Sequence, residues 1–307
     1  KDVILRSAKA LASAKGESLV IASGSNTETE DAIDLQIAVN MLNSMLGNDG
    51  KTIDATNALK EGRTDYNTNI TSLAKSLKDR SIGVLVLYGV NPVYEAPNGD
   101  EWKKLLHEAA QVVTVSDRTD ETALASNWLA PLSHFLESWG DSEAVSGVAS
   151  IQQPTIRPLF SSRAFEDSLI AWAGGSLAGA KSYYDYLKAK YSKKTNWDDL
   201  LRSGVLVSSN IKSDKSARSF KGNIAPLSAS KSGLSLTLYT NVGLANGERA
   251  NNSQLQELPD PVSKVTWDNY LAISPQYSRS AGIKLNDVVT IKVGNQSFDL
   301  PALVQPG

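Results

Sequence analysis

The amino-acid sequence predicts an α/β fold: an open, mostly parallel β-sheet with flanking helices, followed by a smaller β-rich domain. Short apolar runs rich in β-branched residues lie at 19–22, 82–87 and 112–115. Such runs are typical of strands buried on both faces of a parallel sheet. A polar loop and then a helical pattern follow each run. Beyond residue 232 the pattern changes to β alternation, which indicates the second domain.

The composition excludes several classes of function. The 307 residues suffice for one large or two ordinary domains, and the net charge of −2 gives no indication of a nucleic-acid partner. No apolar run has the length of a bilayer span. There are no cysteines, which excludes disulfides, a thiolate nucleophile and a cysteine-ligated iron–sulfur cluster within these residues. The presence of only two histidines, His107 and His134, excludes a histidine-rich metal site, and for His134 the favoured interpretation is a hydrogen-bonded structural histidine.

The first predicted strand, 19–22, leads into a Gly/Ser turn. Gly24 and Ser25 lie in this turn, and Thr27 with Glu30 forms the pattern of a capping box for a helix ending near residue 46. A strand, turn and helix in this order could hold a phosphate on free backbone N–H groups. The turn is not Gly-x-Gly-x-x-Gly and has no P-loop lysine, so an ordinary tight turn is the alternative. Other helices are expected at 2–15, 70–77, 98–109, 162–173, 183–191 and 197–201.

The strand 82–87 is followed by the loop that we expect to form a site. Gly89, Asn91 and Pro92 lie in this loop, at the carboxyl end of the strand, where open α/β sheets bind ligands. For Asn91 the favoured interpretation is a structural Asn-Pro turn. The next strand, 112–115, leads to Asp117 and Thr119, for which capping of the next helix is favoured over binding a base.

The last part of the chain has its own signals. Residues 207–232 are rich in serine and lysine and are expected to contain the domain boundary, which gives domains of 1–225 and 226–307. Residues 234–239 alternate as in a strand, and a hairpin is expected around Gly294. Ser274 is expected to cap a short helix that ends at Gly282. The first residue is Lys1 and the chain stops just after an expected strand, so both ends are interpreted as cuts within a longer protein.

Several motifs, in this order, resemble the C-terminal half of molybdopterin oxidoreductases of the DMSO reductase type. Gly89 to Pro92 resembles the Gly-x-Asn-Pro loop of that family, and residues 117–123 resemble its Asp…Thr-Glu-Thr-Ala loop. Trp267, Asn269 and residues 286–288 resemble its closing β-barrel domain. The resemblance implies a Rossmann-like, nucleotide-binding-like domain followed by a molybdopterin-dinucleotide-binding-like barrel of the double-psi type, here cut short.

Other stretches point to one branch of that family. Residues 91–97, 133–141, 153–158 and 255–261 resemble the large subunit of alternative complex III, a quinol:cytochrome c oxidoreductase. The resemblance implies a region without a molybdenum cofactor, with iron–sulfur clusters elsewhere in the parent protein. It also implies, as partners, other regions or subunits of a membrane-bound respiratory complex on the periplasmic side of a bacterial inner membrane. No catalytic residue and no metal ligand are expected in this fragment.

Three hypotheses therefore stand: a non-catalytic scaffold region, a fragment of an active molybdenum enzyme, and a generic α/β module. In the second, the loops hold the guanosine ends of a bis-molybdopterin guanine dinucleotide, with Ser25 and Thr27 on phosphate and Asp117 on guanine. Arg118 is the only cation in the three loops, which weighs against tight diphosphate binding. Arg249 either contacts a cofactor or partner or is a solvated loop residue. The candidate cofactor-binding residues are Gly24, Ser25, Thr27, Gly89, Asn91, Pro92, Asp117, Thr119, Arg249 and Asn269.

Overall fold

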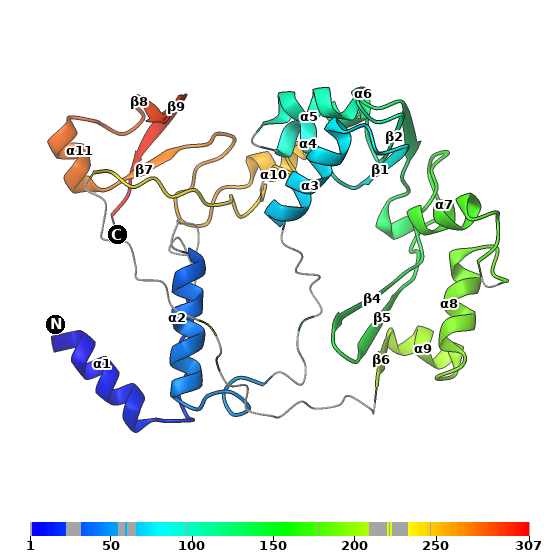
Figure 1. Cartoon of the computed structure of the whole chain (residues 1–307), viewed down its shortest axis with the longest axis horizontal. Helices are drawn as coiled ribbons and strands as arrows, with labels where there is room; N and C mark the ends of the chain where they lie inside the picture. Colours follow the sequence, from blue (N-terminus) through cyan, green and yellow to red (C-terminus); the bar gives the residue numbers. More distant parts are fainter. Residues whose placement is uncertain are drawn as a thin grey trace. The chain divides into compact units, whose positions relative to one another are not determined.

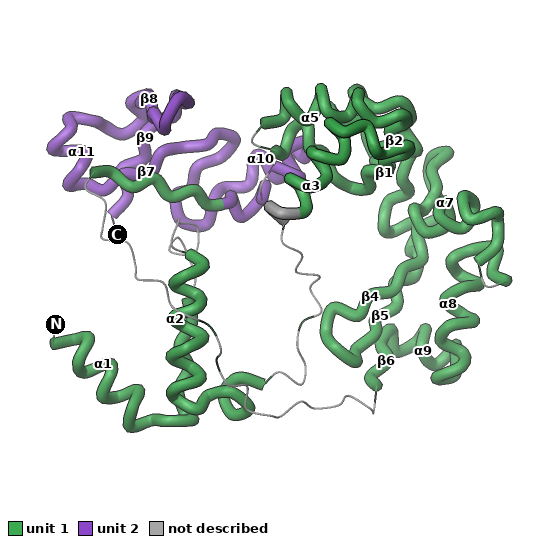
Figure 2. The backbone as a smooth tube through the Cα atoms, viewed as in Figure 1, with its two compact units in different colours: residues 1–239 green, residues 240–307 purple. Residues whose placement is uncertain are grey.

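The computed structural model divides into two compact units, residues 1–239 and 240–307 (Figure 2). The secondary structure is mixed α/β, as predicted (Figure 1). The predicted domain boundary at 225/226 lies outside the described residues, so the domain assignment stays a prediction. The structure describes residues 2–22, 32–54, 59, 66–96, 98–177, 179–208, 220, 222, 233–245 and 247–306.

The first part of unit 1 contains helices α1 (Asp2–Ser13) and α2 (Ala32–Met45). The prediction of a strand at 19–22 is wrong for the structure as described, because these residues pair with no other strand. The side chain of Asn43 takes the place of one strand partner. Its Oδ1 accepts a hydrogen bond from Val20 N (3.0 Å), and its Nδ2 donates to Val20 O (2.8 Å). The predicted turn at 24–27 and its capping box lie outside the described residues.

A parallel sheet forms the centre of unit 1. Its strands β1 (Val84–Tyr88), β2 (Gln111–Ser116) and β3 (Trp128–Pro131) are ordered β1-β2-β3. Helices α3 (Tyr66–Lys78) and α5 (Gly99–Leu106) pack their apolar residues on one face of this sheet. The buried core here consists of Leu77, Leu87, Trp102, Leu105, Leu106, Ala109, Val112 and Ala125.

The prediction that the strand at 82–87 is buried on both faces is wrong. Val84 is 63% exposed, Val86 39% and Tyr88 45%. The physical reason is that β1 is an edge strand of the described sheet and that the helices packed on this core cover the opposite face, where Leu87 is buried. Val84 and Val86 therefore lie on the face that these helices leave uncovered, and on that face Tyr88 stacks on the ring of Phe165.

A second, antiparallel sheet follows, which the sequence did not predict. Strands β4 (Gly140–Val145), β5 (Val148–Gln152) and β6 (Val205–Val207) are ordered β4-β5-β6. Ile151 of β5 packs with residues of the neighbouring helices in a second core, Leu187, Tyr191, Trp197 and Leu200. The helices of this region are α7 (Phe165–Trp172), α8 (Tyr183–Tyr191) and α9 (Trp197–Ser203).

Unit 2 contains α10 (Ser253–Glu257), β7 (Leu271–Ile273), α11 (Pro275–Ala281), β8 (Val288–Val293) and β9 (Gln296–Val304). The predicted hairpin is confirmed: Val293 pairs with Gln296 across a turn in which Gly294 has φ +58°. Ser274 caps α11 and Gly282 ends it, also as predicted. The strands are ordered β7-β9-β8 and close no barrel within the described residues, so the double-psi barrel stays a prediction.

One further prediction has a clear outcome. The expected strand at 234–239 is wrong, because no regular strand forms there and these residues belong to unit 1. In the part of the chain that the structure describes, no helix is both long and apolar enough to cross a membrane.

Candidate functional site

Gly89 begins the loop at the carboxyl end of β1. Its φ of +61° lies in the left-handed region, which favours glycine. Its N–H donates to Val115 O at 3.2 Å and so extends the β1–β2 ladder by one residue. Pro92 then opens α4 (Pro92–Glu95) at a position where a missing N–H costs nothing. Both residues shape the backbone here, and neither offers a free donor.

The Asn91 side chain joins this loop to the loop after β2. Its Oδ1 accepts hydrogen bonds from Thr122 Oγ1 (2.6 Å) and Thr122 N (3.2 Å), while its Nδ2 donates to Glu121 Oε2 (2.8 Å). Thr122 is fully buried and its hydroxyl also accepts from Val93 N. The hydrogen bond from Asn91 is the main cause that holds the pKa of Glu121 below its usual range. We call Asn91, Glu121 and Thr122 the Asn91 lock.

Asp117 and Arg118 form a bidentate ion pair beside this lock. Arg118 Nε and Nη2 donate to the two carboxylate oxygens of Asp117, each at 2.8 Å. These hydrogen bonds lower the pKa of Asp117. Arg118, the one cation of this loop, is therefore already neutralised by the neighbouring Asp117.

The residue that caps the following helix, α6 (Glu121–Leu124), is Asp120. Its Oδ1 accepts from Ala123 N at 2.8 Å. The prediction that Asp117 or Thr119 does so is wrong, because Asp117 is engaged by Arg118 and Thr119 is exposed without a hydrogen bond to any described residue. Only Asp120 has the N-cap position, three residues before Ala123, whose N–H has no backbone partner within the helix and is bound by the Asp120 side chain.

The remaining candidates lie in unit 2 or outside the description. Arg249 lies 3.2 Å (Nε) from Glu248 Oε1, and both side chains are more than half exposed. Asn269 is also exposed. The structure therefore gives Arg249 the features of a solvated loop arginine. Gly24, Ser25 and Thr27 lie outside the described residues.

The described groups at the carboxyl edge of the sheet do not fit a guanosine diphosphate. A diphosphate needs free N–H donors and positive charge. Here the N–H of Gly89, the amide of Asn91 and the guanidinium of Arg118 are all engaged by protein partners. Glu121 adds a negative charge, and Pro92 has no donor. In the part of this edge that the structure describes, these groups hold two loops together.

Sequence reasoning missed a second polar cluster in unit 1, which we call the Asp141 cluster. Asp141 Oδ1 accepts from Tyr183 Oη (2.5 Å), and its Oδ2 accepts from Lys190 Nζ (2.6 Å) and Tyr191 Oη (2.7 Å). Burial by itself raises the pKa of Asp141, but the hydrogen bonds from Lys190, Tyr183 and Tyr191 outweigh it, and the pKa lies below its usual range. Tyr183 and Lys190 are seven residues apart on α8, a spacing that could have indicated a shared face.

His134 makes a local structural contact. Its Nδ1 accepts from Leu136 N, while Glu137 Oε2 accepts from His134 N, so the two residues form a capping box. This arrangement confirms the interpretation of His134 as a hydrogen-bonded structural histidine. Among the described residues, no group of three or more His, Asp or Glu side chains is placed to hold a metal ion.

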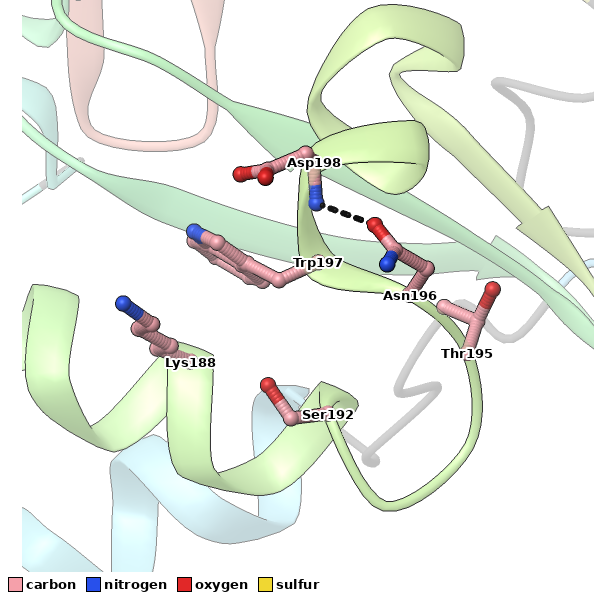
Figure 3. Close-up of a pocket in the computed structure, with 6 residues that line it drawn as sticks. All are labelled: Lys188, Ser192, Thr195, Asn196, Trp197 and Asp198. Atoms are coloured by element: carbon pink, nitrogen blue, oxygen red, sulfur yellow. Dashed lines mark hydrogen bonds between the residues drawn. The ribbon is translucent and has the colours of Figure 1, made fainter.

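A cavity of about 320 Å³ lies between α8 and the start of α9, and none of the predicted site residues lines it (Figure 3). Asn196 Oδ1 accepts from Asp198 N at its rim (2.9 Å). The buried Trp197 Nε1 beside it has no hydrogen-bond partner among the described residues. The cavity is lined by Lys188, Ser192, Thr195, Asn196, Trp197 and Asp198.

Together these features define an α/β protein whose parallel strands end in loops that bind one another. No protein-family profile matches the chain. The chain is 31% identical over 219 residues to the molybdopterin-binding-like subunit of menaquinone reductase from Nitratidesulfovibrio vulgaris, over 66% of this chain and 32% of that subunit. The chain thus spans about a third of the curated relative's length. The resemblance to molybdopterin proteins predicted from the sequence is confirmed.

A solved structure, acetylene hydratase from Pelobacter acetylenicus, superposes with a TM-score of 0.49 at 12% identity. This superposition covers 78% of the present chain and 38% of the hydratase.

Proposed function

We propose that the chain is a region of an oxidoreductase subunit in a respiratory complex, and that it acts there as a scaffold without a molybdenum cofactor. The relative named above is described as a molybdopterin-binding-like subunit of menaquinone reductase, which supports the placement in such a complex. Its partners would be other regions or subunits of the complex on the periplasmic side of the membrane. Iron–sulfur clusters would be ligated elsewhere, since this chain has no cysteine.

The observation that carries the scaffold role is the Asn91 lock. In this lock the amide that a ligand could use is bound to Glu121 and to the buried Thr122. A loop that holds a diphosphate keeps its donors free for that group. Here the polar groups at the carboxyl edge stabilise the join between two loops, which is the task of a scaffold.

The alternative is a fragment of an active molybdenum enzyme that holds the ends of a molybdopterin guanine dinucleotide, with unit 2 as part of a double-psi barrel. Metal analysis of the purified intact complex separates the two. The scaffold role predicts molybdenum far below one atom per chain and no extractable pterin. A stoichiometric molybdenum content with pterin would overturn it.

Metal analysis of a variant of Asn91 tests whether this residue serves the cofactor or the scaffold. Asn91→Ala should weaken folding or assembly of the complex and leave its metal content unchanged. If the complex of the wild-type chain contains molybdenum and Asn91→Ala loses it at constant assembly, Asn91 serves the cofactor and the scaffold role is wrong. Asn98→Ala is the matched control, because Asn98 donates to Glu101 on the exposed side of a neighbouring helix.

A further inference from the structure

The cavity between α8 and α9 gathers side-chain donors that have no acceptor among the described residues. Its volume of about 320 Å³ is at the lower end of the range for small-ligand pockets. Lys188 and Ser192 border it from α8 and its C-cap, while Asn196 and Trp197 border it from the start of α9 (Figure 3). None of these residues belongs to the Asn91 lock or to the Asp141 cluster, so the cavity is a separate candidate for binding a ligand.

The first observation is the indole N–H of Trp197. Trp197 is only 6% exposed, and its Nε1 is buried without a hydrogen-bond partner among the described residues. A buried donor without an acceptor is unfavourable, and native structures rarely keep one without a reason. The rings of Tyr184 and Trp139 lie at centroid distances of 5.8 and 6.2 Å and hold the indole in its orientation. The donor therefore has a fixed direction and lacks an acceptor.

The second observation is the ammonium group of Lys188. It has no carboxylate partner among the described residues, and its Nζ lies 5.9 Å from the centroid of the Tyr184 ring. Figure 3 shows this Nζ on the same side of the cavity as the Nε1 end of the Trp197 ring. The other lysine of the last turn of α8, Lys190, already binds Asp141. Lys188 is therefore the cation of this turn that is available to a ligand.

The backbone at the start of α9 does not supply the donors of this cavity. Asn196 Oδ1 accepts from Asp198 N (2.9 Å) and from Asp199 N (3.1 Å), which uses two of the free N–H groups at the start of this helix. Asn196 then has only its Nδ2 left to donate, and Ser192 offers a hydroxyl on the opposite wall (Figure 3). A ligand here would be held by side chains.

We propose that this cavity binds a carboxylate, with one oxygen accepting from Trp197 Nε1 and the other paired with Lys188 Nζ. A carboxylate offers both the acceptor oxygens that the indole requires and the negative charge that the ammonium requires. Because the indole N–H is covered in the structure, the ligand displaces a lining side chain as it enters. Lys188 is exposed and flexible, so it can move aside and then pair with the ligand. This site is independent of whether the parent protein binds a molybdopterin.

The neighbouring carboxylate of Asp198 does not take this role. Asp198 is exposed and makes no hydrogen bond with Trp197 Nε1. Its charge is solvated and screened, so it should weaken the binding of a singly charged anion only slightly. Its repulsion is larger for a doubly charged phosphate. The site should therefore prefer a carboxylate to inorganic phosphate.

Proton–nitrogen NMR of the full chain observes the indole N–H directly. The chain has six tryptophans, and Trp197→Phe identifies which of their indole signals belongs to Trp197. Butyrate should move this signal saturably at about millimolar concentration, and sodium chloride at the same ionic strength should not. Lys188→Gln should weaken the binding at least about tenfold, because it removes the charge. The matched control is Lys193→Gln, a nearby lysine that does not line the cavity, which should change the binding less than about twofold.

A second titration distinguishes the sources of the carboxylate. A short neutral peptide with a free C-terminal carboxylate is compared with the same peptide as its C-terminal amide. If the free peptide binds more tightly than butyrate and the amide does not bind, the site takes the chain end of a partner protein. If butyrate binds at least as tightly as the free peptide, the site takes a free organic acid.

Three results overturn the proposal. The first is the absence of a saturable shift up to about 10 mM of either carboxylate. The second is equal weakening by Lys188→Gln and Lys193→Gln, which would mean that the lysines act only through general screening. The third is tighter binding of inorganic phosphate than of butyrate. If Trp197→Phe does not fold, the signal is assigned from wild-type spectra that link it to the backbone, and the two lysine variants then decide.

Discussion

Unit 1 contains two polar clusters that join distant segments, the Asn91 lock and the Asp141 cluster, and they differ in charge and burial. The lock is built on a neutral amide, and its Glu121 is exposed. The Asp141 cluster is built on a carboxylate whose side chain is 13% exposed and which accepts hydrogen bonds from an ammonium group and two phenols. Hydrogen bonds to a buried charge are stronger than those between neutral groups.

The conspicuous motif and the strongest contact therefore need not coincide in a protein. The Asn-Pro loop is visible in the sequence, yet it joins its partners through a neutral amide. The Asp141 cluster joins β4 to residues 42 to 50 positions later, on α8, and has no motif. If this comparison is right, variants of Asp141 should destabilise unit 1 more than variants of Asn91.

The largest effect is expected for Asp141→Asn. The substitution keeps the shape but removes the charge that binds Lys190 and a lone pair that binds a phenol. We expect a loss of about 2–3 kcal/mol in the free energy of unfolding, measured by urea denaturation followed by tryptophan fluorescence. Asp198→Asn, at an exposed aspartate of the same region, should change it by less than about 0.5 kcal/mol. Equal effects of the two variants would contradict the comparison.

The second effect is a pH dependence that follows from the lowered pKa of Asp141. A carboxyl group with a folded pKa below its unfolded value of about 3.9 contributes stability above that value. The contribution is lost as the pH falls through the folded pKa. The difference in unfolding free energy between wild type and Asp141→Asn should therefore have its full size at about pH 7 and should shrink below about pH 4. If the difference stays constant down to the lowest pH at which the chain folds, the charge of Asp141 is not what stabilises unit 1.

The third effect is that of Asn91→Ala, which leaves the buried hydroxyl of Thr122 with one partner fewer. We expect a loss of about 1–2 kcal/mol, less than for Asp141→Asn, measured in the same urea experiment. Asn91→Asp sharpens the comparison, because it places a second carboxylate against Glu121 and should be worse than alanine at neutral pH. A result in which Asn91→Asp is tolerated would mean that Glu121 is not held at Asn91.

Local signals predicted much of the fold. The strands near 82–87 and 112–115, the cap at Ser274 and the turn at Gly294 each depend on a few neighbouring residues. Burial was not predictable in the same way, because whether Val84 is covered depends on elements far away in the chain. The segment 19–22 has the composition of a strand, but the side chain of Asn43 satisfies one of its edges.

For the candidate site, too, local features were predictable from the sequence and long-range contacts were not. The sequence placed Asn91 and the Asp117–Ala123 loop at one edge of the sheet, and the structure brings Asn91 against Glu121 and Thr122. The sequence could not show that Asp120 is the N-cap of α6, because four neighbouring polar residues compete for the N-cap position. Antiparallel β4–β6 and the Asp141 cluster were missed because β4 is mostly polar, β6 has only three residues, and their contacts are long-range.

The smallest effect on stability, and the sharpest test of how the carboxyl edge is used, is expected for Arg118→Ala. Arg118 and Asp117 are 43% and 47% exposed, so their ion pair contributes little and the loss should stay within about 0.5 kcal/mol. The same pairing should keep the wild-type chain from binding inorganic pyrophosphate or GDP in calorimetric titrations at low salt. Salt-dependent binding by the wild type that Arg118→Ala abolishes would mean that the guanidinium leaves Asp117 for a phosphate. The carboxyl edge would then be a ligand site after all, and the Asn91 lock would be its support.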